Sequence, residues 1–437
     1  MTQSQQSFLV IGGGIAGIQA SLDLADRGYK VHLVEESPSI GGKMALLDKT
    51  FPTMDCSICI LAPKMVEVLR HPNIDLLTYS EIRGVEGEKG NFRVIVAKKP
   101  RYVDPSKCIG CGICATRCPS RVKDEYQMSL GDRKAIYMPF PQSVPLVYCV
   151  DPESCLFLTK GICRVCERFC EAGAIDFDQK EELVFLKPSG IIIATGLRVS
   201  KPIEIEEYGY GRFRDVLNAM EFERTLTATG PTGGELLKPS NGEHPRNIAF
   251  IQCVGSRSLR EGYPYCSAVC CMHATKQAIL VKEHSPETTV TIFYTDIRAN
   301  GKDFRQFINR ARTEYGVNYV RGKPGEVRED TETNQLEFYY EDTLTAQIHK
   351  VNVDLLVLST ALLPSEKNGE LARLLGVQTD EYGFIKQLDP LTSPLSTTVD
   401  GIYVCGFAQG PKDIPDTIVE ASGVASIAST IHPSIGE

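Results

Sequence analysis

The sequence predicts an α/β fold in which nucleotide-binding strand and helix units host an inserted α+β module rich in cysteine. Three observations support this class. The first forty residues alternate as apolar strand, glycine turn, helix and strand. A second series of apolar strands starts at Ile248. Between the two, residues 104–178 carry clustered cysteines and scattered prolines.

The N-terminal segment carries a dinucleotide-binding fingerprint. The apolar residues 8–11 run into Gly12, Gly14 and Gly17. In this pattern the first glycine permits a tight turn, the second lets the backbone approach a pyrophosphate, and the third lets helix and strand pack closely. We therefore expect the N-terminus of the following helix to face an anion.

An acidic residue and a second glycine turn follow. Residues 30–34 form the next predicted strand, which leads into Glu35, about 20 residues beyond the glycines. A carboxylate at that place binds ribose hydroxyls and disfavours a 2′-phosphate. Gly41, Gly42 and Lys43 form a further turn just after it. The spacing alone predicts a dinucleotide without saying which one.

The rest of the chain supplies strands, hairpins and loops around this segment. Residues 74–98 alternate like hairpin strands, which we expect to form a small sheet covering the first domain. Residues 227–247 are rich in Gly, Pro and Ser and predict a long loop. Apolar runs predict strands at 183–186, 191–196, 248–252, 290–294, 336–340, 353–359 and 401–406, those from 248 to 359 in a second α/β unit, and a helix at about 415–430.

The inserted module repeats a cysteine pattern typical of bacterial ferredoxins. A C-x2-C-x2-C-x3-C-P run begins at Cys108, and a second run, with Glu171 in place of the proline, ends at Cys170. In such runs the fourth thiolate binds the other cluster. This crossing rule assigns one [4Fe–4S] cluster to Cys108, Cys111, Cys114 and Cys170, and the other to Cys118, Cys155, Cys163 and Cys166, with Cys149 as an alternative to Cys155. Zinc is the alternative metal, but the tight first run suits an iron–sulfur cluster better.

A third cysteine set stands at the head of the second α/β unit. Cys253 directly follows the predicted strand at 248–252, and Cys266, Cys270 and Cys271 complete the set. A second glycine fingerprint is expected at this point in pyridine-nucleotide flavoproteins, but the segment after Cys253 offers one glycine and cannot cradle the pyrophosphate of NAD(P)H. Four thiolates in so short a stretch predict a third [4Fe–4S] cluster in place of the nicotinamide site.

Composition excludes several classes of function. The net charge is -8 and no long Lys/Arg run occurs, so neither nucleic acid nor an anionic membrane is an expected partner. No apolar run approaches the roughly 18 residues of a membrane helix, and no secretory leader precedes the first strand. We expect a cytoplasmic protein that meets a membrane only through a partner subunit. Sixteen mostly clustered cysteines indicate metal ligation and not a disulfide framework.

The turn at residues 37–43 resembles that of the two-dinucleotide-binding flavoproteins, which include thioredoxin reductase. This resemblance implies that the first site holds FAD and that a strand ending in Thr195 and Gly196 returns the chain to the first sheet. It also implies a flavin-binding turn near Gly406.

A sharper resemblance spans almost the whole chain. The segments Asp55–Cys59, Tyr265–Lys276 and Gly410–Ile414 are similar to those of the flavin-binding subunit of heterodisulfide reductase. In that family the four cysteines of the third set bind a [4Fe–4S] cluster beside FAD, and the lysine matching Lys276 approaches the flavin ring. A cation there would stabilise reduced flavin. The alternative for Lys276 is an exposed helix lysine.

The residues predicted to contact FAD are Gly12, Gly14, Ile15, Ala16, Gly17, Glu35, Glu36, Gly41, Gly42, Lys43, Thr195, Gly196, Lys276 and Gly406. The predicted organisation places the FAD-binding domain at 1–100, 181–240 and 356–437, the inserted domain with two [4Fe–4S] clusters at 101–180, and the second α/β domain at 241–355.

Four cysteines fall outside the three sets. Cys56 and Cys59 are predicted as half of a fourth cluster, completed by Cys149, Cys405 or a partner chain; a redox-active pair near the flavin and two small core residues are the alternatives. Cys405 is expected to serve packing. His273, beside the third set, is not expected to bind iron.

The favoured function is that of an electron-transfer flavoprotein within a heterodisulfide reductase-like or quinone-interacting complex, in which partner subunits reduce the substrate. Compared with the long archaeal members, the chain lacks an extra N-terminal domain and a C-terminal ferredoxin and looks like the short forms, for which electron bifurcation is in doubt. The alternatives are a stand-alone NAD(P)H-dependent flavin reductase with a ferredoxin insert, and a zinc-stabilised interaction module.

Overall fold

The computed structural model describes residues 6–431 except Pro202, Glu204, Glu261, Thr331 and Asn334. The chain divides into two compact units. Unit 1 comprises Met1–Ala45, Ile58–Leu197 and Pro364–Glu437, and unit 2 comprises Leu46–Ser57 and Arg198–Leu363. Among the described residues, no helix is both long enough and apolar enough to cross a bilayer.

Unit 1 is built on a seven-stranded sheet of order β22-β23-β24-β11-β1-β2-β3. Its strands are β1 (Ser7–Ile11), β2 (Lys30–Glu35), β3 (Ile74–Thr78), β11 (Gly190–Ile193), β24 (Ile402–Val404), β23 (Ser393–Thr397) and β22 (Gln387–Asp389). The five from β24 to β3 pair in parallel, as apolar strands buried on both faces do.

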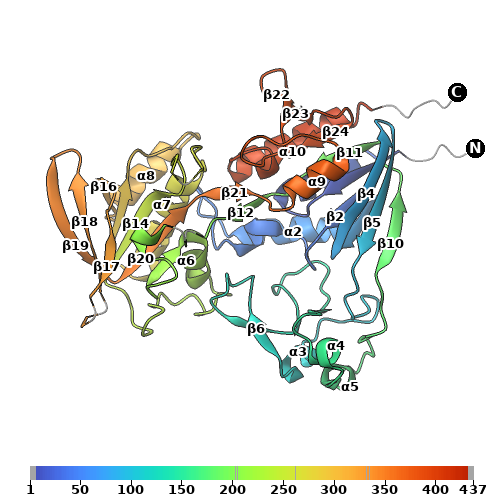
Figure 1. Cartoon of the computed structure of the whole chain (residues 1–437), viewed down its shortest axis with the longest axis horizontal. Helices are drawn as coiled ribbons and strands as arrows, with labels where there is room; N and C mark the ends of the chain where they lie inside the picture. Colours follow the sequence, from blue (N-terminus) through green and yellow to red (C-terminus); the bar gives the residue numbers. More distant parts are fainter. Residues whose placement is uncertain are drawn as a thin grey trace, which may run out of the picture. The chain divides into compact units, whose positions relative to one another are not determined.

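Two layers cover this sheet. One face packs on α1 (Ile15–Asp26), α2 (Ser57–Arg70) and α10 (Ile414–Ala428). The other packs on α9 (Asn368–Leu375) and on an antiparallel sheet of β10 (Glu182–Leu186), β5 (Asn91–Lys98) and β4 (Ser80–Glu88). Figure 1 shows α9 and α10, from the end of the chain, beside elements from its beginning.

The cysteine-rich insert has short elements around its own core, which includes Cys114 and Cys155. They are α3 (Ile113–Arg117), β6 (Arg121–Lys123), β7 (Asp132–Lys134), β8 (Ile136–Tyr137), β9 (Cys149–Val150), α4 (Leu156–Lys160) and α5 (Val165–Arg168). Such short helices cannot bury much apolar surface, so the insert needs further cross-links to be rigid.

Unit 2 contains a parallel sheet of order β13-β20-β14-β15-β16. Its strands are β13 (Val216–Asn218), β20 (Leu355–Thr360), β14 (Asn247–Val254), β15 (Thr289–Tyr294) and β16 (Asn318–Arg321). Its helices are α6 (Ala219–Leu226), α7 (Cys270–His284) and α8 (Phe304–Thr313), and β17 (Val327–Glu329), β18 (Leu336–Asp342) and β19 (Gln347–Val353) form a separate antiparallel sheet. The remaining elements of the chain are β12 (Leu197–Val199), β21 (Leu362–Pro364) and the short helices η1 (Gly42–Leu46), η2 (Glu206–Tyr208) and η3 (Gly406–Ala408).

The structure confirms most predicted elements and corrects two. Residues 227–246 form no helix or strand, as the loop prediction requires. The predicted hairpin sheet at 74–98 is wrong in part, because β3 joins the main sheet beside β2. The strand at 336–340 does not belong to the parallel sheet, because it pairs antiparallel with β17 and β19. An alternating pattern defines a strand but not its neighbours.

Candidate cofactor sites

The turn between β1 and α1 requires its glycines. A Cβ on Gly12, whose φ is +106°, would lie 2.4 Å from the carbonyl oxygen of Ala194, and one on Gly17 would lie 1.8 Å from that of Gly12. By contrast, a Cβ on Gly14 would meet nothing within 4 Å, and Gly14 caps α1 without a side chain. The helix N-terminus is therefore open to a ligand phosphate.

The predicted ribose acid lies at the end of β2 and is held by the backbone. Glu35 accepts hydrogen bonds from the N–H groups of Gly13 (2.6 Å) and Ser37 (2.8 Å). Burial raises the pKa of Glu35, and the Ser37 and Gly13 bonds oppose that shift. A buried carboxyl group fixed by the glycine turn is well placed to accept hydroxyl groups of a ribose.

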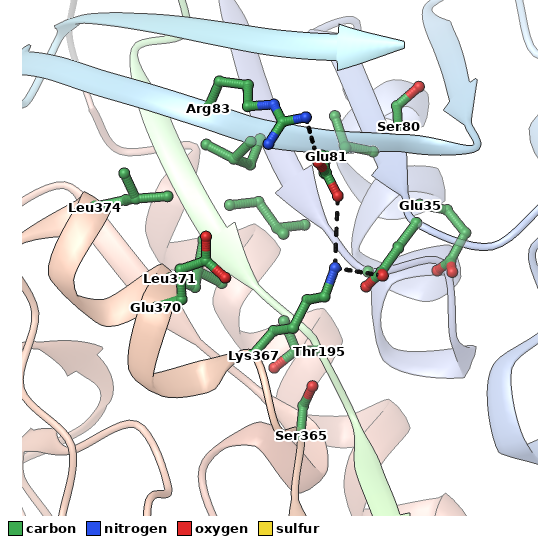
Figure 2. Close-up of a pocket in the computed structure, with 15 residues that line it drawn as sticks. Glu35, Ser80, Glu81, Arg83, Thr195, Ser365, Lys367, Glu370, Leu371 and Leu374 are labelled. Atoms are coloured by element: carbon green, nitrogen blue, oxygen red, sulfur yellow. Dashed lines mark hydrogen bonds and ion pairs between the residues drawn. The ribbon is translucent and has the colours of Figure 1, made fainter. Parts of the chain in front are cut away.

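Glu35 lines a cavity of about 720 Å³ within unit 1, together with Glu36, Thr195 and Lys367 (Figure 2). The ammonium of Lys367 lies 2.5 Å from a carboxylate oxygen of Glu36 and 3.5 Å from one of Glu81. These ion pairs tie the start of α9 to the ends of β2 and β4. The cavity falls in the size range of nucleotide pockets.

Two further turns meet this loop. The N–H of Gly41 donates to the Gly13 carbonyl (2.8 Å), and a Cβ on Gly42 would lie 2.9 Å from Cα of Gly14. Gly196 has φ +70° and open space at its Cβ position. Ile15 and Ala16 are buried in the first turn of α1, and burial lowers the pKa of Lys43.

The turn at Gly406 is held by a pair that the sequence did not reveal. The Gly406 N–H donates to a carboxylate oxygen of Glu420 (2.9 Å), and the Lys412 ammonium contacts both oxygens of that carboxylate at 2.7 and 2.5 Å. Cys405, next to this turn, is fully buried in the apolar core of unit 1. The packing role expected for Cys405 is therefore confirmed.

In the insert, one cavity is lined by the four cysteines of the second predicted set, Cys118, Cys155, Cys163 and Cys166. Around Cys114, the neighbouring thiols are those of Cys108 and Cys111, from the first set, and Cys166. Burial raises the pKa of Cys114 to about 12 and that of Cys166 to about 11, and the neighbouring thiols add to both shifts. Such thiols are protonated at neutral pH unless a metal centre balances their charge.

The third set comes together where β14 ends and α7 begins. Cys253 has φ +59°, Cys270 opens α7, and the thiols of Cys253, Cys266 and Cys271 all lie close enough to raise the pKa of Cys270, after burial as the main cause. No group of three or more His, Cys, Asp or Glu side chains in the described part of the chain has the geometry of a single bound metal ion. The crowding of four thiols nevertheless suits a multinuclear thiolate-bound cluster.

The acid that could bind a ribose in unit 2 is already occupied. Asp296 follows β15 as Glu35 ends β2, but the Arg257 guanidinium grips both its oxygens at 2.6 and 3.2 Å. Arg257 also lies 4.0 Å from the thiol of Cys253. A bidentate pair of this kind holds the carboxylate away from any ribose hydroxyl.

Lys276 lies in the middle of α7 and is fully buried, which shows that the exposed-lysine alternative is wrong. Its ammonium binds the carboxylate of Glu223, which is also fully buried. Burial alone would raise the pKa of Glu223, but Lys276 and the hydrogen bond from His273 lower it well below its usual value. His273 thus contacts Glu223, at 3.0 Å, and Gln277 donates to the same carboxylate at 2.9 Å.

The cysteines left outside the three sets fall into two groups. Cys56 and Cys59 are disulfide-bonded, which matches the redox-pair alternative and removes both thiols from cluster ligation in this state. Cys149 is fully buried, and burial raises its pKa to about 11.

Sequence and structure comparisons agree with this architecture. Residues 8–49 match the FAD dependent oxidoreductase family and residues 101–123 match the 4Fe-4S binding domain family. Thioredoxin reductases from Lactococcus lactis and T. acidophilum share the fold, with TM-scores of 0.52 and 0.50, identities of 17% and 14%, and coverage of 98% and 97% of this chain and of 99% and 98% of theirs. The predicted two-dinucleotide-binding fold class is confirmed.

Curated relatives are much closer in sequence. The chain is 51% identical over 98% of its length to the iron-sulfur flavoprotein subunit of the CoB–CoM heterodisulfide reductase of Methanocaldococcus jannaschii, and 47% identical over 96% of its length to the corresponding subunit of the H2:CoB-CoM heterodisulfide,ferredoxin reductase of Methanothermobacter thermautotrophicus. It spans 64% and 63% of those two proteins. The chain belongs to the heterodisulfide reductase family of iron–sulfur flavoprotein subunits.

Proposed function

We propose that the chain holds one FAD and three [4Fe–4S] clusters and exchanges electrons with partner subunits of a heterodisulfide reductase-like or quinone-interacting complex. FAD accepts two electrons and releases them singly, whereas each cluster carries one. The observation that carries the proposal is the replacement of a nicotinamide site in unit 2 by the cysteine set at Cys253 and the Arg257–Asp296 pair.

The residues of unit 1 hold the cofactor in this proposal. Gly12, Gly14 and Gly17 shape the pyrophosphate cradle, and Glu35 orients the ribose. The twelve cysteines of the three predicted sets bind the clusters, with the domain limits predicted above. Cys56 and Cys59 provide no fourth cluster while their disulfide persists.

Lys276 provides a fixed positive charge at the flavin ring in this proposal. Full burial keeps water away from the ammonium, and Glu223 fixes its position. A cation held in a dry site stabilises developing negative charge more strongly than one in water. Whether the protein divides electron pairs between two acceptors depends on potentials that the partner subunits also set, and we assign the chain to the cytoplasmic side of any membrane complex.

Anaerobic purification of the native complex tests the proposal. We expect about twelve iron atoms, as many acid-labile sulfides and one FAD per chain, together with other subunits. Mixed rapidly with NADH or NADPH, the isolated chain should keep its flavin oxidised. Zinc in place of iron, or fast bleaching of the flavin by either nucleotide, would contradict the proposal and favour the zinc module or the stand-alone reductase.

A further inference from the structure

A short segment of the insert lies between the flavin-side turn and the first cysteine loop. The carbonyl of Val144 accepts hydrogen bonds from the Ile40 N–H (3.1 Å) and the Ser39 hydroxyl (3.2 Å). Two residues further on, Leu146 packs so closely on Gly110 that a Cβ there would lie 3.1 Å from its side chain. The segment therefore touches both the turn predicted to lie against FAD and the loop of the first cluster.

The side chain of Tyr148 ends on this same cysteine loop. Gly112 has φ +82°, and a Cβ on it would lie 3.0 Å from the Tyr148 hydroxyl oxygen. Burial raises the pKa of Tyr148, and the thiolates of Cys114, Cys111 and Cys108 add to the shift, so all three lie within electrostatic reach of the hydroxyl. Across the described part of the chain, no protein atom is found to accept the Tyr148 proton.

The second cysteine set has a different surrounding. Its cavity is walled by hydrocarbon side chains, including Ile136, Leu156 and Phe177, and Ser120 is the one hydroxyl residue among the described residues that line it. A cation is near each set: Lys134 donates to the carbonyl of Cys118 at 2.6 Å, and Arg101 carries charge close to Cys108. The nearby cations therefore do not distinguish the two sets, whereas the phenol does.

We propose that Tyr148 donates an O–H···S hydrogen bond to the cluster held by Cys108, Cys111, Cys114 and Cys170, and thereby gives that cluster a higher reduction potential than its neighbour in the insert. Hydrogen bonds to sulfur and exposure to solvent stabilise the extra negative charge of a reduced cluster. Cys111 and Ile109 are exposed, which acts in the same direction. The inference rests on the proposed function, because it requires both clusters.

The test is a redox titration of the full chain, followed by electron paramagnetic resonance, with Tyr148→Phe. Loss of the hydroxyl should shift one of the two ferredoxin-type clusters to a lower potential and leave the other unchanged. The matched control is Tyr137→Phe, which removes a phenol from the same insert that lies under Arg133 and beside Cys149, away from both sets. A Cys111→Ser variant, which alters the spectrum of the first cluster alone, identifies the cluster that shifts.

A second readout needs no change in potential. Pulsed resonance on the wild-type chain in H2O and D2O should find a strongly coupled exchangeable proton at the higher-potential cluster, and Tyr148→Phe should lack it. Unchanged potentials and an unchanged proton signal in Tyr148→Phe overturn the inference and leave the proposed function standing. A shift of the second cluster, or loss of iron from the Tyr148→Phe chain, also overturns it. An insert without iron in the wild-type chain overturns both.

Discussion

The chain contains the same local arrangement twice, with different chemistry in each copy. In unit 1, β1 leads through the glycines of residues 12–14 into α1 and then β2. In unit 2, β14 leads through residues 255–269 into α7 and then β15. The first turn presents backbone N–H groups to an anion, and the second gathers thiols. A parallel strand and helix pair thus places ligands at one sheet edge whatever those ligands are.

The acids that follow the second strand differ in the same way. Glu35 is buried and held by backbone N–H groups at the edge of an open cavity. Asp296 is gripped by Arg257. Topology is retained between the copies, but each group that reads a nucleotide in the first is replaced or blocked in the second.

The largest expected effect comes from Gly12→Ala in the first turn. The new methyl group would overlap the Ala194 carbonyl at a backbone conformation that alanine avoids, so we expect at least a hundredfold loss of FAD affinity. Iron content should not change. Flavin and iron assays on the purified chain measure both. The control is Gly28→Ala, where φ is +89° but space is open, and FAD should remain bound.

In unit 2 the largest effect should come from Glu223→Gln. It leaves the fully buried Lys276 ammonium without its counter-charge, which costs about 3–5 kcal/mol. Hydrogen exchange of α6 and α7 reports this locally. The double variant Glu223→Gln with Lys276→Met should recover most of the protection. If the single variant exchanges as slowly as wild type, the buried pair is not what holds the two helices together.

The pair also predicts a pH dependence. Because the folded-state pKa of Glu223 is lowered, its stabilisation is present above the unfolded value near 4.5 and is lost only as pH falls through the folded value. The difference in protection between wild type and Glu223→Gln should therefore be constant from pH 8 to about pH 5 and shrink below that. A difference that already declines between pH 8 and 6 would assign the effect to another group.

The smallest effect is expected from Arg257→Leu. The pair with Asp296 is partly exposed, so its removal should cost less than about 1 kcal/mol. It frees the acid but adds no glycine cradle, so NADH should still fail to bleach the flavin. Bleaching in this variant and not in wild type would show that a nicotinamide site persists in unit 2 beneath the ion pair.

Local spacing made the glycine loop and the ferredoxin runs predictable, because their chemistry depends on neighbours within a few residues. Glu223 was missed because its partner Lys276 lies 53 positions away and nothing in the α6 sequence distinguishes it from a surface glutamate. The Arg257–Asp296 pair joins two loops and is invisible to periodicity for the same reason. Strand β18 was assigned to the wrong sheet because alternation does not identify a pairing partner.

The central claim is that the cysteine set at the head of α7 binds an iron–sulfur cluster where a nicotinamide would otherwise bind. The most direct measurement is the iron, sulfide and flavin content of the anaerobically purified chain beside its Cys270→Ala variant. The account predicts that the variant loses about four iron atoms and as many sulfides and keeps its FAD. Equal iron in both chains, or zinc released by the substitution, would contradict it.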